Sequence, residues 1–207
     1  MKPRLSTSYS RSQREEAPYR LTPGRTMLLL LMGGSFMMFL FLLVNMVVYS
    51  LRQGSSRLQL PETFVVSTWV LLITSFILRR TRDHLQSEAL KPALYHLNAA
   101  LASLLSFIGL QMVAWFTLLK QLDLETTPRT LVHYVYFVTG MHMVHVLVAL
   151  GMVASFWLNF FKRRRDPVAE LILFTDPTLV RRFQNTEWFC HYTDGVWILI
   201  FISLLIV

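Results

Sequence analysis

Apolar residues in this chain come in long continuous blocks, without the alternating or one-sided patterns of strands and helices in water-soluble domains. A helix crosses the hydrocarbon core of a bilayer with about 20 mainly apolar residues. Five blocks are long and apolar enough to do so, and the pattern predicts five membrane-spanning helices joined by four loops. The blocks cover roughly residues 27–49, 62–78, 94–118, 131–160 and 187–207.

The placement of positive charge gives the predicted bundle an orientation. Of the twenty Lys and Arg residues, sixteen lie in the N-terminal tail and in the second and fourth loops, and four lie in the other two loops. Cytoplasmic loops of membrane proteins carry such an excess. The sequence therefore predicts an all-α integral membrane bundle with a cytoplasmic N-terminus and a periplasmic C-terminus. Its parts are a flexible, basic cytoplasmic tail over residues 1–26 and a five-helix membrane domain over residues 27–207.

Composition narrows the functional classes. The chain has 207 residues, 54% of them hydrophobic and 15% charged, with a formal net charge of +8. The cations gather beside membrane ends, as in FKRRRD at residues 161–166, where anionic headgroups attract them. We therefore expect no nucleic-acid partner. The tail and loops are too short to bury a core of their own, so we expect the protein to act in the membrane or at its surface.

Ionisable residues inside the predicted spans need a partner or a functional role, because a charge at mid-membrane costs roughly 2.5–3.5 kcal/mol on insertion scales. His142 and His145 stand three residues apart in the fourth span, and His191 and Asp194 have the same spacing in the fifth. Residues three apart share a helical face. We expect the two faces to meet, with Asp194 accepting a hydrogen bond from a histidine, in a polar network that fixes helix packing. Other polar residues in the spans are Asn45, His96, Gln111, His133 and Glu187.

Proton relay and haem ligation are the alternative roles for these histidines. Axial ligands approach a haem from opposite faces, so His142 and His145 cannot both bind one haem from a single helical face. One haem between His142 and His191 stays open, whereas a two-haem arrangement lacks a second pair of histidines. The sequence shows no nucleophile with an adjacent base and no carboxylate cluster for a divalent metal. We therefore predict no catalytic residue and no metal site.

Four segments resemble subunit III of the haem-copper oxidases. TGMHMVHVLVALG at residues 139–151 resembles the family signature TG-x-H-x-x-H-V, and WFCHYTDGVWILIFISLL at 188–205 resembles its terminal W-x-x-V-D-x-V-W segment. LPETFVVSTWVLLITSFIL at 60–78 resembles the LP-x-x-x-x-x-N-T opening of a family helix, and LSFIGLQ at 105–111 matches F-x-G-x-Q. The resemblance covers roughly residues 25–207. Five spans correspond to the shorter bacterial form, which lacks the first two helices of the seven-helix form.

The chain departs from the family pattern in its first span. Many members carry a buried glutamate there, in a segment like A-S-E-x-M-F-F, but GGSFMMF at residues 33–39 has Ser35 at that position. A family role that depends on this acid is therefore not carried over. Ser67 and Thr68 also stand where the family has N-T, without the asparagine. Ser35 and Gln111 are candidates for a lipid-cleft or helix-one site.

The resemblance implies an accessory function in aerobic respiration. Subunit III of this family holds no haem or copper, packs on catalytic subunit I beside subunit II, binds phospholipid and supports proton uptake and turnover. For this chain it implies a multi-pass protein of the bacterial inner membrane, with haem and copper only in partner subunits and with other respiratory complexes as further candidate partners. Two alternatives stay open: a haem b membrane anchor of a quinone-linked oxidoreductase, and a lipid-binding scaffold in a larger respiratory assembly.

Overall fold

This computed structural model describes residues 23–53, 61–121, 129–176 and 178–207. These residues form six α-helices and no strand. Five helices are long and apolar enough to cross a membrane, as the hydrophobic blocks predict. The five are α1 (Pro23–Gln53), α2 (Thr63–Gln86), α3 (Leu90–Gln121), α4 (Arg129–Arg163) and α6 (Leu179–Ile206), and the short helix is α5 (Pro167–Thr175).

The polar tail predicted for residues 1–26 lies mostly outside the described residues, and residues 23–26 form the first turn of α1. The spanning helices run past the apolar blocks at several ends. Helix α2, for example, continues to Gln86 through a basic segment that includes Arg79 and Arg82. Long charged side chains have good helix propensity, so nothing in that segment stops the helix at the edge of its apolar block.

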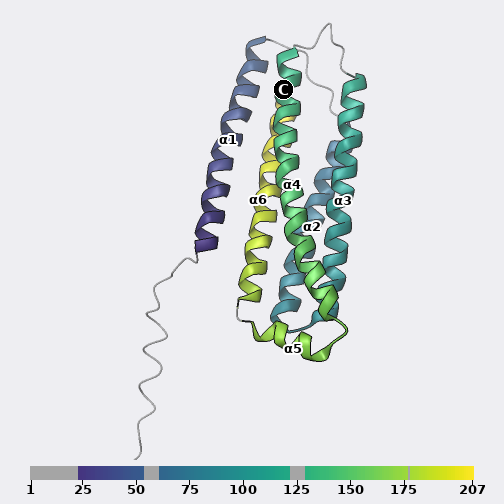
Figure 1. Ribbon diagram of the computed structural model, residues 1–207. Helices are drawn as coiled ribbons and strands as arrows, with labels where there is room; N and C mark the ends of the chain where they lie inside the picture. Colours follow the sequence, from purple (N-terminus) through teal and green to yellow (C-terminus); the bar gives the residue numbers. More distant parts are fainter. Residues whose placement is uncertain (1–22, 54–60, 122–128, 177) are drawn as a thin grey trace, which may run out of the picture.

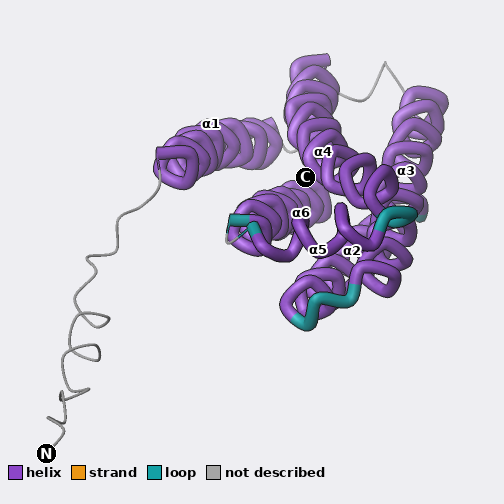
Figure 2. Tube along the Cα trace, turned by 60° about the horizontal axis from the view of Figure 1, so that its bottom comes forward, coloured by secondary structure: helices purple, strands orange, loops and turns teal. Residues whose placement is uncertain are grey.

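The long helices lie side by side, and α6 is the central one (Figures 1 and 2). Helix α6 packs against α1, α2 and α4, whereas α1 stands at the edge of the bundle and packs mainly on α6 and α4. In the most apolar 18-residue stretch of α6, 44% of the residues are buried, whereas the corresponding share in α1 is 11%. Much of α6 therefore faces other helices, while most of α1 is left for lipid or for a partner.

Helix α5 lies across the end of the bundle, in a segment that the hydrophobic pattern assigns to a loop (Figure 1). Asp166 caps its N-terminus by accepting a hydrogen bond from the Val168 backbone N–H at 2.9 Å, and proline occupies the first turn, where its missing N–H costs nothing. After the helix, the Thr178 hydroxyl and backbone N–H donate to Asp176, which lowers the pKa of that carboxyl. These contacts fix the connection between α4 and α6.

The interior of the bundle is organised around the fully buried Trp197 of α6. Its ring centroid lies 6.0 Å from that of Phe64 on α2, 5.3 Å from that of Phe107 on α3 and 5.0 Å from that of His142 on α4. The indole Nε1–H donates to the Thr68 hydroxyl at 2.9 Å. One side chain thus contacts three other helices and has its only polar atom satisfied, as buried tryptophans require.

Candidate functional site

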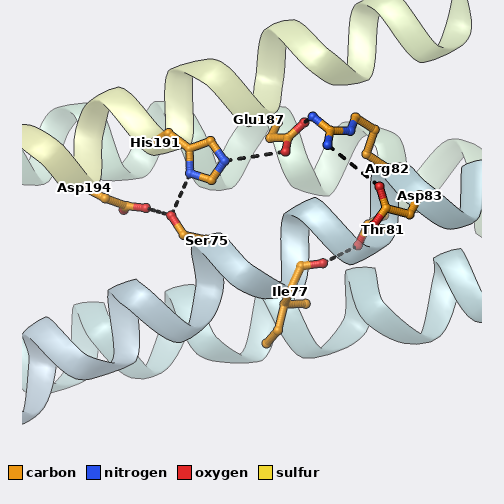
Figure 3. A network of polar contacts seen from close by, with 8 residues as sticks. All are labelled: Ser75, Ile77, Thr81, Arg82, Asp83, Glu187, His191 and Asp194. Carbon is orange, nitrogen blue, oxygen red and sulfur yellow. Dashed lines mark hydrogen bonds and ion pairs between the residues drawn. The ribbon is translucent and has the colours of Figure 1, made fainter.

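One face of α6 is polar, and that face is turned towards α2 (Figure 3). Glu187, His191 and Asp194 are spaced by four and three residues, so at 3.6 residues per turn they lie above one another. Helix α2 presents Ser75 and Arg82 opposite them, seven residues and about two turns apart. The periodicity of both helices therefore brings five polar side chains into one row, which we call the α2–α6 polar chain.

The contacts along the α2–α6 polar chain are continuous. Arg82 Nη1 donates to Glu187 Oε2 at 3.0 Å, and Glu187 Oε1 lies 3.5 Å from His191 Nε2. His191 Nδ1 lies 2.8 Å from the Ser75 hydroxyl oxygen, and the same hydroxyl donates to Asp194 Oδ2. The Ser75 hydroxyl thus joins the histidine to the aspartate, and the chain runs from the basic end of α2 towards the middle of α6.

The geometry constrains where the protons are. Because Ser75 has one hydroxyl proton and donates it to Asp194, its oxygen accepts from the Nδ1–H of His191. The other ring nitrogen then faces a Glu187 oxygen at 3.5 Å, an arrangement that is favourable when a proton lies between them.

The α2–α6 polar chain is buried at its two carboxylates and partly exposed to the surroundings at His191. Glu187 is 1% exposed and Asp194 is 7% exposed, whereas the side chain of His191 is 38% exposed. A pocket of about 370 Å³ opens beside the histidine. Ser75, Phe76, Arg79 and His191 line it. The carboxylates are therefore held inside the protein, and the α2–α6 polar chain meets the surroundings at the imidazole and, to a smaller extent, at Arg82.

Among the described residues, the histidines of α4 form no hydrogen bond or ion pair with the α2–α6 polar chain. His142 is fully buried between aromatic rings, and neither of its nitrogens has a hydrogen-bond partner among the described residues. His145 Nδ1 bonds the Met141 carbonyl at 2.9 Å, and its ring lies 5.2 Å from Phe39 of α1. The four predicted network residues therefore fall into two pairs at different places.

The expected hydrogen bond from a histidine to Asp194 is accordingly corrected: Asp194 accepts from Ser75 of α2. The reason is the angular position of the residues on α6. Asp194 lies on the same side of the helix as Glu187, and that side meets α2, while Tyr192 is turned to the side where His145 lies. Spacing within α6 places His191 and Asp194 on one face, but the helix opposite that face is α2 and not α4.

Ser35 and Gln111, the candidates for a lipid-cleft or helix-one site, lie on different helices, and no hydrogen bond joins them within the described residues. Ser35 lies 2.6 Å from the Tyr192 hydroxyl of α6 and also donates to the Met32 carbonyl at 3.2 Å. Gln111 is fully buried in α3, and neither atom of its amide group has a hydrogen-bond partner in the part of the chain that the structure describes. Ser35 therefore acts as a contact between α1 and α6.

The remaining polar candidates have local roles. Asn45 donates to the Phe41 carbonyl at 2.7 Å, and His96 Nδ1 lies 2.9 Å from the Pro92 carbonyl oxygen, both one turn back on their own helices. His133 is exposed near the start of α4. These side chains satisfy their own backbone or face outward, and they do not extend the α2–α6 polar chain.

Sequence reasoning missed Ser75 and Arg82 as members of the site. A signal was present, because the two residues stand seven apart on one face of α2 and Glu187, His191 and Asp194 share one face of α6. What the sequence lacks is the information that these two faces are neighbours.

The site does not fit a haem held by His142 and His191. The His142 ring is fully buried against Trp197 and Phe107, and an axial bond from it would require these rings to move. Among the described residues, no group of three or more His, Cys, Asp and Glu side chains is placed to hold a metal ion.

Fold and site together define a multi-pass α-helical membrane protein in which a buried polar chain joins two spanning helices. No protein-family model matches the chain, and no curated protein matches it.

Proposed function

We propose that this protein is the non-catalytic subunit III of a bacterial haem-copper terminal oxidase. In this role it packs on the catalytic subunit I beside subunit II, binds phospholipid and supports proton uptake and turnover. The haem and copper belong to the partner subunits. The N-terminus lies in the cytoplasm and the C-terminus in the periplasm, as the distribution of Lys and Arg predicts.

The observation that carries this proposal is the convergence of the four resembling segments on one side chain. Trp197 comes from the terminal segment, His142 from the TG-x-H-x-x-H-V segment, and Phe107 from the F-x-G-x-Q segment. Phe64 and Thr68, from the segment that opens α2, contact the same indole. Segments that resemble one family in sequence are thus parts of a single packed core, which supports reading them as one inherited unit.

The α2–α6 polar chain suits an accessory subunit. Its carboxylates are buried, with Glu187 paired to Arg82 and Asp194 bonded to Ser75, so their first effect is to hold two helices in a fixed register. Buried polar groups in membranes often have such a packing role, with modest individual energies. Oxygen reduction is left to the partner in this proposal.

Ser35 has a structural role in the proposed function. Its hydroxyl contacts Tyr192, where many members of the resembling family have a carboxylate. Helix α1 (Pro23–Gln53) contains no Asp or Glu at all. The proposal therefore assigns no proton-handling role to α1.

The test is a gentle affinity purification through a tag on this chain, followed by reduced-minus-oxidised visible spectra. The proposal expects haem and copper oxidase features in the purified material, and their loss from the chain once its partners are stripped away. Purification without any oxidase subunit would refute it. A haem b spectrum that stays with the stripped chain would favour the quinone-linked anchor instead, and partners without haem would favour the lipid-binding scaffold.

A further inference from the structure

A second pocket, of about 350 Å³, lies between the beginning of α3 and the end of α4, away from the α2–α6 polar chain. Figures 1 and 2 show these two helix ends beside each other at one end of the bundle. The volume falls in the range of roughly 300–1,000 Å³ that is typical of small-molecule sites. Its lining residues are Leu90, Lys91, Leu94, Tyr95, Asn98 and Arg164.

The polar groups of this pocket are hydrogen-bond donors. Lys91 and Arg164 contribute two cations, and neither forms an ion pair within the described residues. Asn98 uses its carbonyl oxygen to accept from the Trp157 indole, so its NH₂ group is left to donate. The Tyr95 hydroxyl can donate as well. A set of donors with two positive charges and no carboxylate selects for an anion.

The pocket is held in shape by its surroundings. The Arg164 guanidinium lies 3.8 Å from the ring centroid of Phe161, in a cation–π contact that restricts its position. The acids nearest in sequence are Asp166, which caps α5 through its bond to the Val168 N–H, and Glu88. Among the described residues, neither forms an ion pair with Lys91 or Arg164.

The position of the pocket identifies the source of the anion. Helix α3 has 32 residues and α4 has 35, more than the ~20 needed for the hydrocarbon core, so their ends reach the headgroup layer. Leu90 and Leu94 provide the apolar part of the lining, while Trp157 and Tyr95 are residue types that favour this interface. Basic pockets between membrane helices on the cytoplasmic side bind the headgroups of anionic lipids.

We propose that Lys91, Asn98 and Arg164, with Tyr95 at the rim, bind the phosphate of an anionic phospholipid whose acyl chains lie along the groove between α3 and α4. The site is separate from Ser35 and helix α1. It does not rest on the proposed oxidase function, because it needs only that the chain spans a membrane with the beginning of α3 and the end of α4 on the cytoplasmic side, as the distribution of Lys and Arg predicts.

The experiment is a titration of the purified full-length chain in detergent with phosphatidylglycerol, followed by native mass spectrometry, with phosphatidylcholine in a parallel arm. The double variant Lys91→Gln/Arg164→Gln is compared with Lys162→Gln/Arg165→Gln, which removes the same charges from exposed neighbours that do not line the pocket. At about a fivefold change in affinity per cation, the first double variant is expected to bind phosphatidylglycerol about 25-fold more weakly, and the second to bind it normally.

Charge-preserving variants keep the test independent of folding. Lys91→Arg/Arg164→Lys should retain binding, since two cations remain in the pocket. Equal losses in both Gln double variants would reduce the effect to diffuse attraction by the basic end of the bundle and overturn the proposal. It would also fail if phosphatidylcholine bound equally well. Finally, if the soluble headgroup glycerophosphoglycerol bound as tightly as the lipid, the ligand would be a free anion, and the acyl chains would have no part in the site.

Discussion

At the scale of single residues, the Ser75 hydroxyl is the group on which the α2–α6 polar chain depends, because it bonds both His191 and the buried Asp194. Ser75→Ala leaves the carboxylate without this donor, and an unsatisfied buried polar group costs about 1–3 kcal/mol, with membrane proteins towards the lower values. We therefore expect the free energy of unfolding to fall by about 1–2 kcal/mol, measured by titration with sodium dodecyl sulfate in mixed micelles.

The matched control for this substitution is Ser106→Ala. Ser106 is an exposed serine in α3, and its hydroxyl bonds only the Ala102 carbonyl one turn back. That variant should lose little stability, and Ser75→Thr, which keeps the hydroxyl, should recover most of the loss. If Ser75→Ala and Ser106→Ala lowered the free energy of unfolding equally, the hydrogen bonds of Ser75 to His191 and Asp194 would contribute nothing to stability.

The ion pair between Arg82 and Glu187 should respond unequally to loss of either partner. Glu187 is 1% exposed, whereas the Arg82 side chain is 24% exposed and also lies 3.7 Å from Asp83. Arg82→Gln leaves a buried carboxylate without its arginine and should cost about 3 kcal/mol. Glu187→Gln leaves an arginine that can reach water and should cost about 1 kcal/mol.

The same detergent titration, with Arg80→Gln as a control on an exposed arginine of α2, measures this difference. A larger cost for Glu187→Gln than for Arg82→Gln would contradict the burial of the carboxylate.

At the scale of elements, the faces of α6 explain which contacts could be predicted. Spacing alone places His191 and Asp194 on one face, and the structure agrees. Their partner Ser75 could not be found in this way, because it depends on which helix stands opposite. Trp197 is a related case: it stands three residues after Asp194 in sequence, and its ring contacts His142 of α4 as well as Phe64 of α2, a set of neighbours that spacing cannot reveal.

Trp197 is the side chain through which α6 contacts α2, α3 and α4. Trp197→Phe removes the hydrogen bond to Thr68 and leaves unfilled volume in the core, so we expect a loss of about 2 kcal/mol in the free energy of unfolding. Trp188→Phe is the control, since Trp188 is 40% exposed on the same helix. Comparable losses in the two variants would argue against Trp197 as the centre of the core.

At the scale of the whole molecule, the number of spans followed from the sequence because each apolar block is long enough to cross a bilayer on its own. Helix α5 did not follow, because nine residues are too few to give a clear periodic pattern. Its local signal was the Asp166–Pro167 pair, a helix-start combination that lies directly after a run of basic residues. Short helices at bundle ends depend on such capping residues, and hydrophobicity does not reveal them.

The orientation of the bundle is the last prediction, and it follows from charge alone: sixteen of twenty Lys and Arg residues lie on the predicted cytoplasmic side. The single native cysteine, Cys190, is buried, so cysteines introduced at exposed positions report orientation without background. In intact cells, a membrane-impermeant maleimide should label Arg129→Cys, at the start of α4, and should label Ser87→Cys, between α2 and α3, only after permeabilisation. The reverse pattern would place the basic ends outside. It would then remove the cytoplasmic side as the location of both the anion pocket and the Arg82 end of the polar chain.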